Sequence, residues 1–71
     1  MHHEAKKAYQ SFLRVNPNHP ECNFNLGTIY QYLGEFDDAV LLFNRAIRNK
    51  KGYMKALKAK IVILKKIKKY D

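Results

Sequence analysis

The feature that most constrains how this chain can fold is an internal repeat with a period of 34 residues. When the sequence is aligned with itself at that spacing, small residues align with small residues and aromatic residues with aromatic residues. The clearest pairs are Ala5 with Ala39, Tyr9 with Phe43, Leu13 with Ile47 and Arg14 with Arg48. A period of this length corresponds to one helix–turn–helix unit. We therefore expect the second helix of one unit, a complete unit, and the first helix of a third.

Turn-forming residues divide the chain into four stretches, and within each stretch apolar residues recur at helical spacing. The spacing predicts helices over about 3–15, 20–33, 36–49 and 53–70. Asn16-Pro17 ends the first stretch because the residue before a proline avoids the helical region, and Pro20 suits the first turn of the second helix. The prediction is an all-α fold of stacked antiparallel helical hairpins, with residues 1–71 forming a single domain.

Length and composition agree with a small folded module. Seventy-one residues leave no room for a second core, and 46% hydrophobic residues suffice for one. The single cysteine, Cys22, cannot form an internal disulfide, which fits a reducing compartment, and we expect it to pack as a small apolar residue. No apolar run reaches the roughly 18 residues of a membrane span, and the start lacks the apolar stretch of a signal peptide. The expectation is an intracellular, cytoplasmic protein.

The central unit carries a specific order of residue types. Along the chain these are Leu26-Gly27, Tyr30, Ala39, Phe43 and Ala46. In residue type and spacing the unit resembles the tetratricopeptide repeat, and Ala5, Tyr9 and Pro17 extend the resemblance to the preceding helix. The resemblance therefore covers nearly the whole chain and implies the fold of an α-solenoid fragment that acts in protein–protein interaction or as a scaffold.

Three positions depart from the family pattern. Asn23 stands where an aromatic is usual, Phe12 where a small residue is usual, and Lys51 where a proline ends the repeat. We expect these departures to weaken packing locally without changing the fold class.

Packing physics explains the small residues of the pattern independently of any family. Gly27 and Ala39 are small where two helices of one hairpin approach to roughly 8–10 Å, and Tyr30 and Phe43 fill the space beside them. Glycine costs about 1 kcal/mol relative to alanine inside a helix, so Gly27 indicates a steric need.

The last predicted helix, 53–70, is amphipathic and strongly basic. Residues 45–71 hold eleven of the fourteen Lys and Arg residues of a chain whose net charge is +8. On a helical wheel, one sector of about 100° carries Lys55, Lys58, Lys65, Lys66 and Lys69, interrupted only by Val62. The opposite side carries Ala56, Leu57, Ile61, Ile63, Leu64, Ile67 and Tyr70. One neighbouring helix cannot cover so wide a stripe, so either a further helix or partner covers it, or the chain self-associates through Ile63, Ile67 and Tyr70.

In tetratricopeptide repeats the first helix of each unit lines a concave groove. By that resemblance the groove residues would be Glu21, Phe24, Asn25, Thr28, Gln31 and Tyr32, followed by Lys55, Lys58, Ala59, Val62, Lys65 and Lys66. The lysine sector coincides with this groove, which favours an acidic peptide, a free carboxylate or a partner helix as the ligand. Chaperone-binding members clamp a terminal carboxylate with Asn, Lys and Arg. Asn25 and Lys55 match two of those positions, although Asn before Leu-Gly is also common in the family for structural reasons, and Ala59 stands at the Arg position.

The alternative function is binding of nucleic acid or an anionic surface, because basic residues interleaved with apolar ones also suit those ligands. Against it, lysines outnumber arginines 11 to 3, whereas bidentate recognition of phosphates and bases favours arginine. The only aromatic residues near the lysines are Tyr53 and Tyr70. A solvated face without any ligand also accounts for the lysines.

The sequence offers no catalytic or metal-binding constellation. His2, His3 and His19 have no Cys or acidic partner at ligand spacing, and no glycine-rich phosphate loop occurs. The acidic run from Glu35 to Asp38 fits the N-terminus of a helix, where the macrodipole favours negative charge. We therefore expect no enzymatic activity, no cofactor and no metal.

Overall fold

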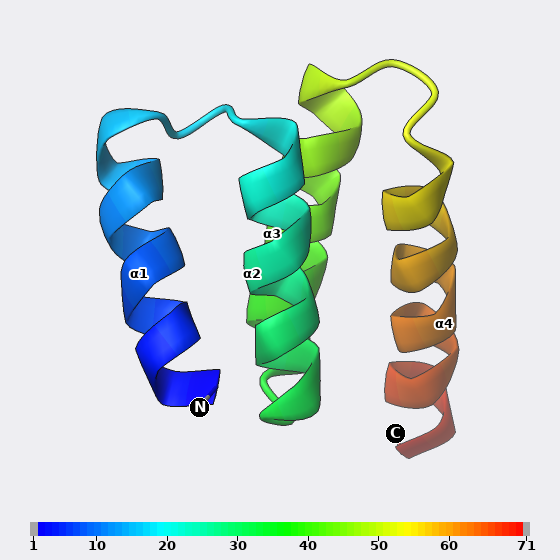
Figure 1. Ribbon diagram of the computed structural model, residues 1–71. Coiled ribbons are helices and arrows are strands. Elements are labelled where there is room, and N and C mark those ends of the chain that lie inside the picture. The colour runs from blue at the N-terminus through cyan, green and yellow to red at the C-terminus, as the bar shows by residue number, and fades with distance from the viewer. Residues whose placement is uncertain (1, 71) are drawn as a thin grey trace.

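The computed structural model describes residues 2–70 as four α-helices joined by short turns (Figure 1). They are α1 (His2–Val15), α2 (Pro20–Tyr32), α3 (Phe36–Asn49) and α4 (Met54–Tyr70). Consecutive helices run in opposite directions, and no strand occurs within residues 2–70. The predicted all-α fold of stacked hairpins is thereby confirmed. The helix ends differ from the expected ranges by one residue at three places, His2, Tyr32 and Met54.

Local sequence sets the ends of α2. Pro20 occupies its first turn, and the Nδ1 atom of the N-cap residue His19 accepts a hydrogen bond from the backbone N–H of Cys22 at 3.2 Å. After the last turn, Gly34 adopts a left-handed φ of 79°, and the N–H of Glu35 donates to the carbonyl of Tyr30 at 2.9 Å. This is the Schellman arrangement, which favours glycine at the left-handed position. The chain therefore reverses tightly at both ends of α2.

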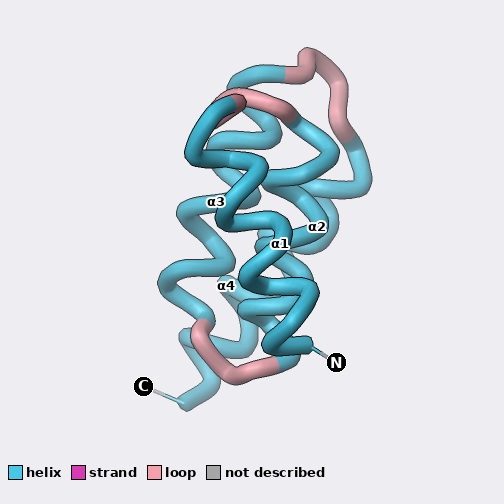
Figure 2. Tube along the Cα trace, turned by 60° about the vertical axis from the view of Figure 1, so that its left-hand side comes forward, coloured by secondary structure: helices cyan, strands magenta, loops and turns pink. Residues whose placement is uncertain are grey.

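The helices pack mainly on their neighbours along the chain. The α2–α3 pair is the most extensive, α1 packs on α2, and α4 packs on α3 and touches α2 only slightly. Figure 2 shows that the loops lie at the two ends of the helices. The molecule measures 35 × 29 × 14 Å, so it is a thin slab with two broad faces.

The interior consists of two apolar clusters. The first, between α1, α2 and α3, contains Leu13, Leu26 and Leu42. The second, centred on α3 and α4, contains Ala39, Phe43 and Ile63. Tyr30 packs against both clusters, and its hydroxyl oxygen accepts a hydrogen bond from Nε2 of Gln10 at 2.9 Å. Tyr30 therefore joins the two halves of the array.

The close helix approach predicted at Gly27 is confirmed. A Cβ atom built on Gly27 would lie 2.8 Å from Cε1 of Phe43 and 3.0 Å from its Cδ1. Ala39 and Phe43 are both fully buried. The backbone of α2 thus lies directly against the Phe43 ring, which only glycine permits.

Of the three residues expected to mediate self-association, the structure places Ile63 in the core and Ile67 against it. Ile63 is 0% exposed, and Ile67 is partly buried against the same cluster. The side chain of Tyr70 lies outside the described residues. The rotation of α4 about its axis turns this part of the apolar stripe toward α3. The large apolar residues that α4 leaves exposed are Met54, Leu57, Ile61, Val62 and Leu64.

Asn23, one of the departures from the family pattern, lies in the interior. It is fully buried, and its Nδ2 atom donates hydrogen bonds to the carbonyl oxygens of Pro17 and His19, both at 2.9 Å. Its Oδ1 atom is buried without a hydrogen-bond partner among the described residues. The side chain therefore ties the start of α2 to the turn that follows α1.

Replacing Asn23 with alanine is expected to lower the free energy of unfolding by about 1–3 kcal/mol, because two hydrogen bonds from Nδ2 are lost and a fully buried side chain is shortened. Thermal and urea unfolding followed by circular dichroism measures the change. Asn25→Ala is the matched control, since Asn25 lies in the same helix but is exposed. Equal effects of the two substitutions would contradict a role for Asn23 in the turn.

Candidate interaction surface

The α2 side of the predicted groove is formed by polar and aromatic side chains. Asn25 and Tyr32 are exposed, and Thr28 and Gln31 are half-buried. The hydroxyl of Thr28 donates to the carbonyl of Phe24 at 3.1 Å, so its oxygen is left as an acceptor. The Tyr32 ring stacks on His2 with 5.2 Å between ring centroids, which links this surface to the start of α1.

Phe24 occupies the place where α2, α3 and the start of α4 meet. Its ring lies 5.7 Å from Phe43 and 5.6 Å from Tyr53, measured between centroids. Phe24 is only partly buried and packs against the second cluster. Phe24, a predicted groove residue, therefore joins α2 to α3 and to Tyr53, which directly precedes α4.

A polar cluster lies beside Tyr53. Nζ of Lys50 lies 2.7 Å from Oε2 of Glu21 and 4.6 Å from the centroid of the Tyr53 ring. The hydrogen bond from Lys50 lowers the pKa of the Glu21 carboxyl, and the same bond raises the pKa of Lys50. Burial raises the pKa of the Tyr53 hydroxyl. Glu21, the one acidic residue of the expected groove, is thus already paired with a cation.

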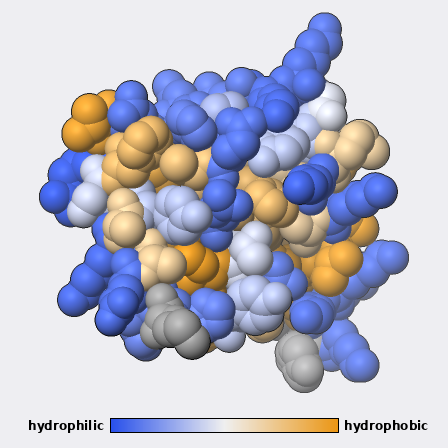
Figure 3. Space-filling view, viewed as in Figure 1, coloured by the Kyte–Doolittle hydropathy of each residue, from blue (hydrophilic) through white to orange (hydrophobic). Residues whose placement is uncertain are grey.

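The α4 residues expected to line the groove are mostly basic. All four lysines among them are exposed, namely Lys55, Lys58, Lys65 and Lys66. Val62 lies among them and is 46% exposed. Ala59 is half-buried against the second cluster and supplies no charge at the position where a carboxylate clamp needs arginine. In the view of Figure 3, long hydrophilic side chains project from the side of the molecule where α4 lies.

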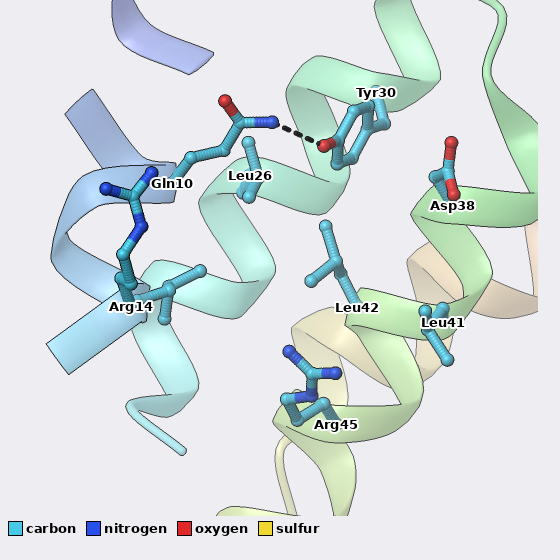
Figure 4. A pocket seen from close by; sticks show the side chains of 9 residues that line it. Gln10, Arg14, Leu26, Tyr30, Asp38, Leu41, Leu42 and Arg45 are labelled. Carbon is cyan, nitrogen blue, oxygen red and sulfur yellow. Dashed lines mark hydrogen bonds between the residues drawn. The ribbon is translucent and has the colours of Figure 1, made fainter. Parts of the chain in front are cut away.

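The structure has a hollow between α1, α2 and α3 that sequence reasoning missed. It has a volume of about 310 Å³ and is lined by α1, α2 and α3 (Figure 4). Leu13, Leu26 and Leu42 supply apolar surface, and the polar lining comes from Gln10, Arg14, Tyr30, Asp38 and Arg45. Its charges are of both signs, so it has no clear preference for an anion. The hollow depends on the distance between α1 and α3, which a one-dimensional pattern does not contain.

Cys22 packs against the first cluster, as predicted. Burial raises the pKa of its thiol, and the nearby negative charge of Glu21 raises it further. A raised pKa reduces the reactive thiolate fraction.

Among the described residues, no group of three or more His, Cys, Asp or Glu side chains is placed to hold a metal ion. A search of the same residues found no helix with the length and apolar character needed to cross a bilayer.

Stacked antiparallel hairpins, a glycine that admits an aromatic ring, and a 34-residue period define a helical repeat protein. A family model described as tetratricopeptide repeat matches residues 1–61, and the chain belongs to that family. This is a non-catalytic type of repeat used generally in protein–protein interaction. The comparison with curated proteins and the comparison with solved structures gave no match.

Proposed function

We propose that this chain is an interaction module that binds an acidic, extended peptide along its groove. The groove is here the face of α2 at Asn25, Thr28, Gln31 and Tyr32, together with the α4 face at Lys55, Lys58, Val62, Lys65 and Lys66. The lysines offer ammonium donors to carboxylates, and the α2 side chains offer amide and hydroxyl groups to a peptide backbone.

The observation that carries the proposal is the segregation of charge on α4. The helix holds seven lysines and no acidic residue, and within the described residues none of these lysines forms an ion pair with an acidic side chain. The three ion pairs found involve Lys6, His19 and Lys50 instead. A surface whose charges are not neutralised from within attracts an acidic ligand and accelerates its association.

The test is a fluorescence titration with a short peptide in which glutamate alternates with alanine. Reversing Lys55 and Lys58 together to glutamate is expected to weaken binding roughly tenfold, because each exposed pair contributes about 0.2–1 kcal/mol and reversal adds repulsion. Wild-type affinity should also fall as salt rises, since exposed charges are screened.

Two controls separate a groove from a general charge effect. Lys7→Glu with Lys68→Glu changes the net charge equally at exposed positions outside the groove and should leave affinity within about twofold. A peptide with glutamine in place of each glutamate should not bind. Equal losses from both double variants would refute a groove.

Nucleic acid is tested in the same titration with a duplex and a single-stranded oligonucleotide. Tighter binding of either oligonucleotide than of the acidic peptide, with a steep dependence on salt, would favour the alternative function.

A further inference from the structure

The hollow between α1, α2 and α3 has the features of a second binding site. Each of the three helices contributes one buried leucine to its lining, Leu13 from α1, Leu26 from α2 and Leu42 from α3. Its volume of about 310 Å³ is near the lower end of the range for ligand sites and can admit one large apolar side chain. The hollow shares no lining residue with the groove, so the two surfaces can be tested separately.

Two arginines flank the leucines of the hollow. Arg14 is exposed on α1, and Arg45 is half-buried on α3. Figure 4 shows Arg14 on the α1 side and Arg45 on the α3 side, with their guanidinium groups apart from each other. Within the described residues, no ion pair involves either arginine. Both positive charges are therefore available to acidic groups of a ligand.

The acidic residue of the hollow lies away from Arg45 along α3. Asp38 precedes Arg45 by seven residues, which corresponds to about 10 Å along the helix axis. A charge at that distance is about one Debye length away in physiological salt, so Asp38 does not neutralise Arg45. The hollow as a whole has no preference for an anion, but its positive and negative charges occupy separate places. It can therefore select a ligand by where that ligand carries its acidic groups.

We propose that this hollow binds a segment of a partner protein in which one large apolar side chain is preceded and followed by acidic residues. The apolar side chain lies among Leu13, Leu26 and Leu42, and its burial supplies most of the affinity. The acidic residues pair with Arg14 and Arg45, because a planar guanidinium group can donate two hydrogen bonds to one carboxylate.

Both parts of the lining are needed to choose this occupant. A purely apolar segment would leave the two arginines without a counter-charge. An acidic segment without a large apolar residue would leave the leucines uncovered. An apolar anchor in a pocket with charged residues around it is the arrangement that contributes most to binding at protein interfaces.

A fluorescence titration of the full chain with the labelled peptide Glu-Glu-Phe-Glu-Glu tests the proposal. Replacing Arg14 and Arg45 together with glutamine is expected to weaken binding roughly tenfold, because two charge-assisted pairs are lost. Exchanging the phenylalanine of the peptide for alanine should weaken binding of the wild type at least as much. Circular dichroism checks that helix content is unchanged.

The matched control removes the same charge from the same two helices. Lys7→Gln with Arg48→Gln changes exposed positions of α1 and α3 that do not line the hollow, and should leave affinity within about twofold. Lys55→Gln with Lys58→Gln removes the same charge from the groove and should also have little effect on the phenylalanine peptide.

Asp38→Asn should act in the opposite direction. Its carboxylate repels the acidic residues of the ligand, so its removal is expected to strengthen binding about twofold. Asp37→Asn changes the net charge equally at an exposed position outside the lining, and its effect should be smaller.

Four results would overturn the proposal. They are no binding of the phenylalanine peptide, equal losses in the arginine double variant and its matched control, undiminished binding when phenylalanine is exchanged for alanine, and a larger loss from the groove double variant than from the arginine double variant. The last result would place the peptide in the groove. The peptide of alternating glutamate and alanine tests the groove on its own, so failure of one site is distinguishable from failure of the other.

Discussion

Replacing Ile63 with lysine is expected to abolish the folded state of α4 and to lower the stability of the whole chain severely. Ile63 is 0% exposed and packs with Ala39 and Phe43. Truncation of a buried isoleucine to alanine costs about 2–5 kcal/mol, and an unpaired buried charge costs more. A domain of this length has a total stability of only about 4–10 kcal/mol. Helix content and the urea midpoint, both from circular dichroism at 222 nm, measure the loss.

Val62→Lys is the matched control for this prediction. Val62 precedes Ile63 in the same helix but is 46% exposed and lies among lysines, so the variant should remain helical. If the lysine variant does not fold, the Ile63→Ala variant still gives a measurable urea midpoint, which should be lower than that of the wild type. Equal stability of the Ile63→Lys and Val62→Lys chains would mean that α4 does not pack on α3 through Ile63.

Substitution of Gly27 is expected to destabilise the chain even though every other residue except proline favours a helix more. Because an added Cβ would lie 2.8 Å from the fully buried Phe43 ring, Gly27→Ala should cost about 1–3 kcal/mol of overpacking, partly offset by a gain in helix propensity of about 1 kcal/mol. Gly27→Leu should leave the chain largely unfolded. Urea denaturation measures the free energy of unfolding of both variants.

The Phe43→Leu background separates the steric effect from helix propensity. A smaller side chain at position 43 makes room for a Cβ atom, so Gly27→Ala should become neutral or stabilising by up to about 1 kcal/mol in that background. A destabilisation of the same size in both backgrounds would show that Phe43 is not what requires glycine.

Much of the fold follows from sequence periodicity. Helical spacing and turn residues predict the four helices, and the 34-residue period predicts their order of stacking, because every unit repeats the same contacts. The requirement for Gly27 is also readable, since a glycine that lowers helix propensity implies a close neighbour. These inferences concern contacts between elements adjacent in the chain, and the structure bears them out at Gly27 and Phe43.

The position of each side chain around α4 could not be predicted in the same way. A helical wheel gives the angles between residues but not the rotation of the helix against its neighbour. The wheel therefore shows the apolar stripe as one surface, whereas in the fold Ile63 packs against α3, and Leu57, Ile61 and Leu64 remain exposed. The position of Phe24 and the hollow lined by Leu26 and Arg45 could not be predicted either, because each depends on how three helices pack together.

The division of the interior into two clusters has a consequence for cooperativity. Leu13 and Leu26 stabilise one end of the array, Ile63 stabilises the other, and Tyr30 with the central α2–α3 pair connects them. Each terminal helix can then open while the central pair stays closed, as in a one-dimensional chain of coupled units. Amide hydrogens of α2 and α3 should exchange with solvent deuterium most slowly, and those of α1 and α4 should exchange through separate partial openings.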